Sequence, residues 1–551
     1  MLLPALLQLK SSEENVTSAL QTTQIRPRKA RLGGLRFIAH YTSPRKVLKS
    51  RLAGGKAILL YIAAVNFIGH MLAAGNYGYF RDELYYIVSG QHLQLGYVDF
   101  PPMMAYIAAV LNYLAGDALV AVHVVPALAG AGLVFVAGMI ARELGGNRWA
   151  QALSAIAALV TAQLAFSSIF SMDILDALWW SLAAYIVVRI VRRDKPRLWL
   201  AFGLVAGLGL FTKLTIVFFL VCLLLGLLAT PARRNLLSKW FWAGAAIAVA
   251  FLVPHVAWNA MNGWPTLDFY IHHGGLNGGG PLDFILTQIL IANPVNIPLV
   301  FIGLYFFFRS PLGKSYRLLG VALVFLFVLF TLTDAKPYFY EGAYPILLAG
   351  GAVLAAQKAG KVRRWVPKGF ILALVVSGVL LAPLEMPLLP PAVFVKTYSS
   401  LTGVANGAAA QGNAGQFPQY LGDRFGWETM TATMAAAYDG LPESEKTTSC
   451  IFASNYGEAS ALTFLGRNDS LPPVISTHNN FFIWGPGGCG PVLITVGVNA
   501  SVLQTFYRNV TQVAMVTCDY CMSNEDNLPV YVATEPVGSL QSIWSSIKDF
   551  S

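Results

Sequence analysis

Long runs of apolar residues, separated by short polar stretches, are the main pattern along this chain. Each run is about 20 residues long, the length that a helix needs to cross the hydrocarbon core of a bilayer. The runs begin near positions 57, 119, 150, 174, 198, 214, 240, 284, 318, 338 and 368. The pattern predicts a polytopic α-helical membrane protein with about eleven transmembrane helices.

Charged residues in the short loops predict which helix ends face the cytoplasm, because Lys and Arg are retained on that side. Groups of them precede the first apolar run and recur at every second loop: ARELGGNR, RIVRRDKPR, PARRNLLSK, RSPLGKSYR and KAGKVRRWVPK. We expect the other loops to be extracytoplasmic: residues 76–118, SSIFSMDILD, FTKLT, residues 259–283 and TDAKPYFYEGAYP. The stretch PPMMAYIAAVLNYLAG would invert every later loop if it spanned, so we interpret it as a helix in the outer interface.

The pattern changes near residue 396, where the hydropathy drops. Phe425, Met430, Met434 and Tyr438 have helical spacing, and SCIFAS, PVLITVGV, QVAMVTC and VYVAT are typical of strands. We expect an extracytoplasmic soluble α/β domain in residues 396–551, after a transmembrane domain in residues 57–395. Residues 1–56 are expected to be a basic cytoplasmic segment. Their start, MLLPALLQLKSSEENVTS, lacks the basic region and cleavage site of a signal peptide.

Composition supports this class of protein. Of the 551 residues, 56% are hydrophobic and 12% are charged, and the mean hydropathy is +0.57. A soluble chain is about a quarter charged, so an integral membrane protein is indicated, and we expect it in the bacterial inner (cytoplasmic) membrane. The net charge of +11 does not indicate nucleic-acid binding, because the basic residues are divided among the loops and form no single basic face.

The cysteines are concentrated in the predicted soluble domain. Cys450, Cys489, Cys518 and Cys521 lie there, whereas Cys222 lies in an apolar run. Disulfides form in oxidising compartments outside the cytoplasm, so one or two of them are plausible. Cys518 and Cys521 are alternatively a pair of metal ligands, although no second matching pair accompanies them.

The first extracytoplasmic loop, YGYFRDELYYIVSGQHLQLGYVDFPP, concentrates charge that is scarce elsewhere in the chain. Ionised groups beside hydrocarbon are costly unless they are solvated or functional. Asp82 and Glu83 could simply cap the helix that follows, because carboxylates are favoured at a helix N-terminus. Capping does not account for Asp99, which precedes the rigid pair Pro101-Pro102.

The order and sidedness of these motifs resemble the GT-C membrane glycosyltransferases, family 39-like, which include the protein O-mannosyltransferase and lipid A aminoarabinose transferase group. The matching features are the DE pair of the first loop, an acidic residue before Pro-Pro, and an outer Asp in SMDILDAL. The resemblance implies that Asp82, beside Glu83, is the catalytic base or orients the acceptor hydroxyl. It also matches Asp173 to the second catalytic Asp, with Asp176 as the weaker candidate.

The donor's phosphate needs cationic partners. The aminoarabinose branch has a Lys before Pro-Pro, but this chain has Phe100 there. The cations available on the outer side are Lys213, in a TK turn similar to that of the family, Arg81 and Lys336. Each is alternatively a side chain that extends from a helix end to water.

The resemblance raises a divalent metal as a cofactor, held by Asp99 with His272 or His273 of YIHHGGLNGGG, although a histidine pair is more often a polar interface feature. The glycine run could be a mobile lid. It is not a P-loop, because no Gly-Lys-Ser or Gly-Lys-Thr follows, and we expect no nucleotide cofactor.

The family resemblance implies transfer of a sugar, with inversion, from a polyprenyl-phosphate-linked donor to an extracytoplasmic hydroxyl. The acceptor is a glycan, a lipid or a protein, and membrane lipids are the other partners. Asn455, Tyr456 and Glu458 follow a predicted strand, where α/β sheets bind ligands, so they are candidates for acceptor binding or ordinary cap residues. A transporter or flippase for a lipid-linked sugar is the main alternative, and a non-catalytic scaffold is another. A transporter should place its charges at mid-membrane, whereas here they lie at the outer ends.

Overall fold

The computed structural model describes residues 55–116, 118–272, 279–409 and 415–550, and the predicted cytoplasmic segment up to residue 54 lies outside these ranges. Seven helical segments in this part are long and apolar enough to cross a membrane. They are Gly55–Ala73 (α3), Leu119–Glu143 (α6), Met172–Arg193 (α9), Lys239–Met261 (α12), Gly313–Leu332 (with α16, Arg317–Leu332), Pro337–Lys361 (with α17, Tyr344–Lys358) and Trp365–Glu385 (α18).

Two further apolar segments are bent. Ile216–Leu228 (α11) meets Pro231–Leu237 at 110°, and Pro281–Ile291 (α14) meets Pro294–Arg309, which contains α15 (Ile297–Arg309), at 90°. Counting each bent pair as one span gives up to nine spans in the described residues. The apolar runs near residues 150 and 198 form the shorter helices Arg148–Leu159 (α7) and Leu198–Thr212 (α10). The helical membrane fold is confirmed, but the predicted number of about eleven spans is not.

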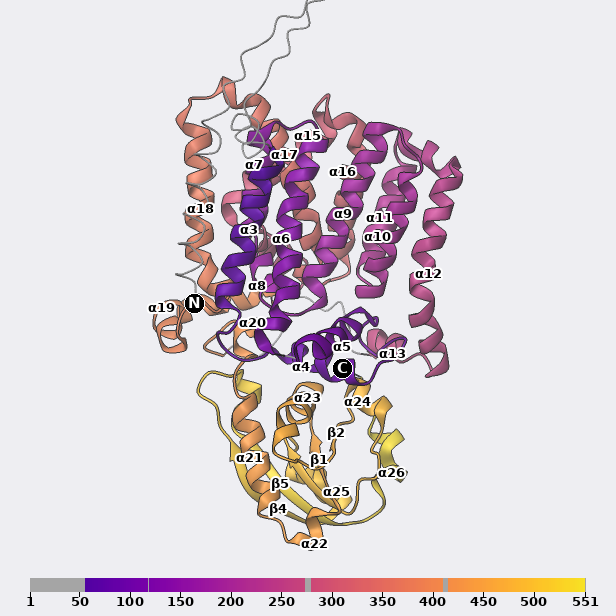
Figure 1. Ribbon diagram of the computed structural model, residues 1–551, viewed down its shortest axis with the longest axis vertical. Coiled ribbons are helices and arrows are strands. Elements are labelled where there is room, and N and C mark those ends of the chain that lie inside the picture. The colour runs from indigo at the N-terminus through magenta and orange to yellow at the C-terminus, as the bar shows by residue number, and fades with distance from the viewer. Residues whose placement is uncertain (1–54, 117, 273–278, 410–414, 551) are drawn as a thin grey trace, which may run out of the picture. The chain divides into compact units, whose positions relative to one another are not determined.

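The long helices run side by side as a bundle (Figure 1), and small residues allow some of them to approach closely. On α10, a Cβ atom added to Gly203 would lie 2.1 Å from the backbone oxygen of Gly244 on α12. Such a contact between backbones is available only to glycine, and it compensates for the weak hydrophobic drive between helices in lipid.

Shorter helices lie across one end of the bundle, where the first loop folds (Figure 1). They include Arg81–Gln91 (α4), Met103–Ala115 (α5) and Pro265–His272 (α13). The stretch that we interpreted as an interfacial helix forms α5. Helix α19 (Pro391–Ala409) runs through residue 396, so the chain enters the C-terminal domain only after that predicted boundary.

The C-terminal domain contains one sheet of five strands in the order β2-β1-β3-β5-β4. The strand β1 is parallel to β2 and β3, whereas β3 and β4 are antiparallel to β5. The bounds are Ser449–Ala453 (β1), Val474–Ile475 (β2), Val492–Val496 (β3), Tyr507–Val516 (β4) and Leu528–Pro536 (β5). Four of these strands match the predicted apolar runs, so the α/β domain is confirmed.

Alternate side chains of the sheet enter two apolar clusters. Ile451 and Ile494 belong to a cluster shared with Trp427–Asp439 (α21), Tyr456–Leu465 (α23) and α4. Cys450 and Leu493 point to the other face, where Trp544 and Leu540 cover them. Cys450 also forms a disulfide with Cys489, which confirms one of the expected bridges. The first cluster joins the domain to the first loop and thereby fixes the loop's catalytic candidates against it.

Candidate active site

Glu83 is a structural residue of α4. Its Oε2 accepts the Phe80 backbone N–H at 2.8 Å, and its Oε1 lies 3.0 Å from His123 Nε2 and accepts the Phe170 N–H at 2.6 Å. Burial alone would raise the pKa of Glu83, but His123, Arg424 and the Phe170 amide lower it below the ordinary value. Glu83 is fully buried and lines no part of the cavity described next. These contacts favour the capping alternative for Glu83.

Asp82, one residue earlier, faces a cavity of about 240 Å³ at the end of the bundle where α4 lies. The polar side chains that line this cavity include Arg81, Asp82, Asp173, Lys336, Asp423 and Tyr456. The fold therefore brings together four residues singled out as catalytic or phosphate-binding and one singled out as acceptor-binding. A larger hollow of about 640 Å³ lies between α21 and the strands β4 and β5, but its lining contains no titratable side chain.

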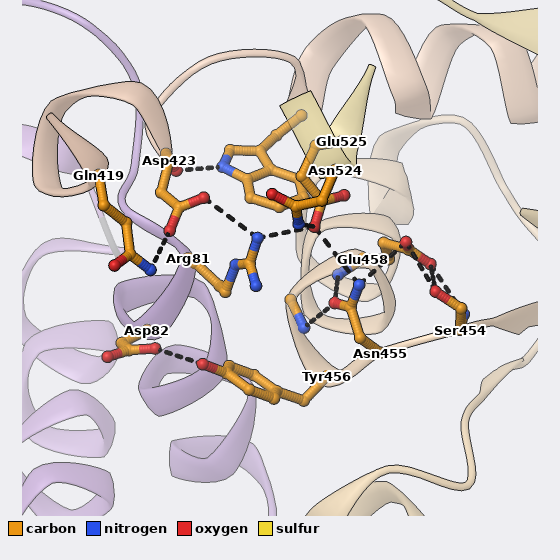
Figure 2. A network of polar contacts seen from close by, with 12 residues as sticks. Arg81, Asp82, Gln419, Asp423, Ser454, Asn455, Tyr456, Glu458, Asn524 and Glu525 are labelled. Atoms are coloured by element: carbon orange, nitrogen blue, oxygen red, sulfur yellow. Dashed lines mark hydrogen bonds and ion pairs between the residues drawn. The ribbon is translucent and has the colours of Figure 1, made fainter. Parts of the chain in front are cut away.

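The carboxylate of Asp82 is held by the C-terminal domain. The hydroxyl of Tyr456 donates to its Oδ1 at 2.8 Å, as Figure 2 shows. Burial raises the pKa of Asp82 to about 6, against the opposing effects of the Tyr456 hydrogen bond and of Arg81. A carboxylate with such a pKa is mostly ionised near neutral pH and is still basic enough to take a proton.

A second carboxylate, Asp173, and one lysine, Lys336, form the other polar part of the cavity, and Lys213 pairs with that carboxylate. Asp173 lies in the first turn of α9 and accepts a hydrogen bond from Lys213, which ends α10. Lys213 Nζ also lies 5.1 Å and 4.8 Å from the ring centroids of Tyr338 and Phe339. Lys336 lines the cavity, and its side chain makes no hydrogen bond or ion pair among the described residues. Burial, and then the charge of Lys213, lowers its pKa.

Arg81 is already paired. Its Nη2 lies 3.1 Å from Asp423 and 2.6 Å from Glu525, both in the C-terminal region of the chain (Figure 2). Gln419 donates to the other oxygen of Asp423 at 3.1 Å. Because two carboxylates compensate the guanidinium, Arg81 ties the first loop to the C-terminal domain. This arrangement makes it a weaker candidate for phosphate binding than Lys336.

The three candidates for acceptor binding divide into two kinds. Asn455 is the N-cap of α23, because its Oδ1 accepts the N–H groups of Gly457 and Glu458 at 2.8 Å and 3.0 Å. Glu458 accepts from the Ser454 N–H and hydroxyl, both at 2.8 Å. These contacts are ordinary for a helix start, so only Tyr456 extends from this turn into the cavity.

Asp99 lies outside the cavity, against the C-terminal domain. It accepts the Tyr85 hydroxyl at 3.1 Å and lies 3.5 Å from the side-chain amides of Asn479 and Asn480. Burial raises its pKa to about 7. The described residues contain no group of three His, Cys, Asp or Glu arranged to hold a metal. The His272 side chain and all of His273 lie outside the described residues, so the predicted metal site is not tested. The reaction proposed for the protein therefore uses no metal-dependent step.

Sequence reasoning missed Asp423 and Glu525, the partners of Arg81. They lie 342 and 444 residues along the chain from Arg81, and nothing in their local pattern marks them. Tyr338 was also missed, although its position in TDAKPYFY, next to a singled-out lysine, was the available signal.

Comparisons with known proteins agree with this fold. A family model, "Dolichyl-phosphate-mannose-protein mannosyltransferase", matches residues 99–258. The lipid A galacturonosyltransferase RgtD of Rhizobium johnstonii is 26% identical over 317 residues, which are 56% of this chain and 66% of that protein. The match thus spans slightly less than two thirds of that relative's length.

Two crystal structures of ArnT from Cupriavidus metallidurans are similar to this chain. The apo structure has a TM-score of 0.57 at 15% identity and covers 88% of this chain and 98% of ArnT. The structure bound to undecaprenyl phosphate has a TM-score of 0.55 at 14% identity, with 86% and 97% covered. The chain shares this fold, and the resemblance to the GT-C membrane glycosyltransferases is confirmed.

Proposed function

We propose that the protein transfers a sugar from a polyprenyl-phosphate-linked donor to an acceptor hydroxyl outside the cytoplasm, with Asp82 as the base. The observation that carries the proposal is the cavity at the end of the bundle where α4 lies. It presents to the same space a partly buried carboxylate of raised pKa and a lysine whose side chain makes no hydrogen bond or ion pair within the described residues. A base for the incoming hydroxyl and a cation for the departing phosphate are what this transfer needs.

In the proposed reaction, Asp82 takes the proton of the acceptor hydroxyl as the oxygen attacks the anomeric carbon. The bond from that carbon to the phosphate oxygen breaks, and the lipid phosphate leaves with the electron pair. Lys336 stabilises the developing negative charge, and Lys213, paired with the lining residue Asp173, adds positive charge next to that carboxylate. A single displacement of this kind inverts the anomeric carbon.

The lipid-linked donor is supported by the position of the cavity. A membrane-embedded site that opens outside the cytoplasm has no supply of nucleotide sugars, whereas a polyprenyl chain partitions into the bilayer and leaves its phosphate at the interface. ArnT from Cupriavidus metallidurans binds undecaprenyl phosphate, and the rhizobial relative is a lipid A galacturonosyltransferase, so both support a lipid-linked reaction. We therefore propose that the protein lies in the bacterial inner membrane with the cavity on the outer side.

A donor panel tests the proposal. The purified protein in proteoliposomes is given radiolabelled polyprenyl-phosphate sugars and, separately, the corresponding nucleotide sugars, and the products of transfer and of donor hydrolysis are measured. We expect turnover of at least one lipid-linked donor and none of the nucleotide sugars. Turnover of a nucleotide sugar contradicts the proposal. The proposal is also contradicted if the lipid-linked sugar crosses the bilayer intact, with neither transfer nor hydrolysis, because that result would indicate a flippase.

A further inference from the structure

Two cysteines of the C-terminal domain stand apart from the disulfide that is already formed. Cys518 and Cys521 lie in a turn after β4, which ends at Val516, and both are free thiols. The other free thiol in the described residues, Cys222, is buried in α11. The turn leads directly to Ser523–Glu525 (η7), whose Glu525 pairs with Arg81.

The turn directs a backbone N–H at the sulfur of Cys518. The N–H of Cys521 donates to Cys518 Sγ at 3.1 Å, and the Cys521 thiol donates to the Cys518 carbonyl oxygen at 3.7 Å. The Cys518 N–H donates to Asp526 at 2.9 Å, which fixes the other side of the turn. A donor aimed at a sulfur stabilises the thiolate, and the neighbouring Cys521 side chain, followed by the backbone N–H groups of Tyr520 and Cys521, lowers the pKa of Cys518 to about 7.

The two sulfurs differ in access. Cys518 is partly exposed, whereas Cys521 is 7% exposed. An outside reagent can therefore reach Cys518 first, and Cys521 is positioned behind it. Gly426 packs against both, since a Cβ atom there would lie 3.3 Å from Cys518 Sγ and 3.4 Å from Cys521 Cβ. Metal binding needs further ligands, and the described residues contain no group of three that includes this pair.

We propose that Cys518 and Cys521 are a redox-active dithiol that forms a disulfide by exchange with an external disulfide, Cys518 being the attacking thiol and Cys521 the resolving one. The Cys518 thiolate attacks one sulfur of the external disulfide and releases the first thiol. Cys521 then loses its proton, attacks Cys518 Sγ and releases the second thiol. Two protein thiols are oxidised and one external disulfide is reduced to two thiols, so atoms and electrons balance. The closed ring restrains the segment that carries Glu525.

A redox titration of the full-length protein tests this proposal. The protein is equilibrated at pH 7 with mixtures of reduced and oxidised glutathione, quenched with an alkylating reagent, and analysed by peptide mass. We expect the peptide with Cys518 and Cys521 to pass from two alkylated thiols to an internal disulfide, while the Cys222 peptide stays reduced. A pair that stays fully alkylatable at every ratio overturns the proposal.

Two single variants assign the order of attack. Cys521→Ser should accumulate a mixed disulfide with glutathione on Cys518, because the resolving thiol is absent. Cys518→Ser should form the corresponding adduct at least about threefold more slowly, since Cys521 is buried and lacks the donors that favour its thiolate. Equal rates in the two variants would overturn the assigned roles. The wild-type titration remains decisive if a variant fails to fold.

Discussion

Asp82 is a carboxylate whose chemistry depends on its burial and on two neighbours, Tyr456 and Arg81. Burial favours the protonated acid, whereas the Tyr456 hydroxyl and the charge of Arg81 favour the ionised form. The balance raises the pKa to about 6. If the ionised form is the base, the rate should rise with pH through that region and level off above it.

The Tyr456 hydrogen bond can be tested on the same profile. Tyr456→Phe removes a donor that favours the ionised form of Asp82, so the pKa of Asp82 should rise. We expect the pH–rate profile of kcat/KM to shift to higher pH, with a lower rate at pH 6 and partial recovery at pH 8. Tyr113→Phe is the control, because Tyr113 is 88% exposed on α5. An unchanged profile in Tyr456→Phe would mean that the hydroxyl does not act on the base.

Lys213 allows a test of phosphate stabilisation. Lys213→Met keeps the length of the side chain and removes the charge beside Asp173. Hydrogen bonds to charged groups contribute about 1.5–3 kcal/mol, so kcat/KM for the lipid-linked donor should fall about 10–100-fold. The same substitution at Lys446, a lysine whose ion pair with Glu443 lies at the surface of the C-terminal domain, should leave the rate unchanged. A Lys213→Met enzyme with wild-type kinetics would remove this lysine from the mechanism.

For single residues, the sequence predicted which side chains line the cavity better than it predicted which of them contact one another. Asp82, Asp173 and Lys336 were identifiable because each lies at the end of an apolar run that was predicted to face outside the cytoplasm. The bond between Tyr456 and Asp82 joins residues 374 positions apart. No periodicity relates such residues, so the tyrosine was assigned to the acceptor and not to the base.

Helix α4 shows how one element places two adjacent carboxylates in different roles. Successive residues of a helix point about 100° apart, so Glu83 turns into the bundle toward His123 while Asp82 faces the cavity. In the DE pair, the second residue is a structural anchor and the first faces the cavity. Of the two alternatives from the sequence, capping is favoured for Glu83, and catalysis is what we propose for Asp82.

The buried contacts of Glu83 are expected to stabilise the folded protein. Glu83→Gln puts an amide N–H against backbone or imidazole donors and removes a buried charge interaction. We expect destabilisation of about 3 kcal/mol and a lower Tm for thermal unfolding in detergent at pH 7. Glu428→Gln, at an exposed position in the first turn of α21, should have little effect. An unchanged Tm in Glu83→Gln would contradict the anchoring role.

The same contact has a pH dependence with a defined sign. The pKa of Glu83 is lowered in the folded protein. Its contribution to stability is therefore fully present above the ordinary pKa of a glutamate and is lost as the pH falls through the lower folded value. The difference in Tm between wild type and Glu83→Gln should accordingly shrink in acid.

Hydropathy predicted where helices occur better than how many spans they make. Hydropathy depends only on how many residues are apolar. It therefore does not reveal that one run is interrupted at Asn293, which has a φ of 68°, and at Pro294. It also does not reveal that the helix formed by the run near residue 150 ends at Leu159. The strands of the C-terminal domain were predictable because their apolar runs are short and separated by turns. Their pairing order was not, because it depends on contacts between distant segments.

Arg81 connects the two halves of the molecule. It belongs to the first loop, and its partners Asp423 and Glu525 are 1% and 3% exposed. Breaking a buried ion pair by removing one partner costs about 3–5 kcal/mol, because a charge remains buried without compensation.

Hydrogen exchange tests this connection. Arg81→Met should raise the exchange rates of peptides within residues 415–427 and 516–527 on the order of a hundredfold, while the helices of the bundle keep theirs. Arg467→Met, which removes an exposed guanidinium beside Phe464, is the matched control. If the exchange rates of these two segments were the same in Arg81→Met as in the wild type, the ion pairs would not hold the domain in place.

The central claim is that Asp82 is the base of a sugar transfer, and Asp82→Asn tests it most directly. Asparagine retains the oxygen that accepts the Tyr456 hydrogen bond and loses the ability to take a proton. The measurement is single-turnover transfer from a lipid-linked donor at equal amounts of folded protein, with Asp439→Asn, an exposed site at the end of α21, as control. We predict a loss of at least about a hundredfold in Asp82→Asn and none in the control. Transfer by Asp82→Asn at the wild-type rate would contradict the mechanism.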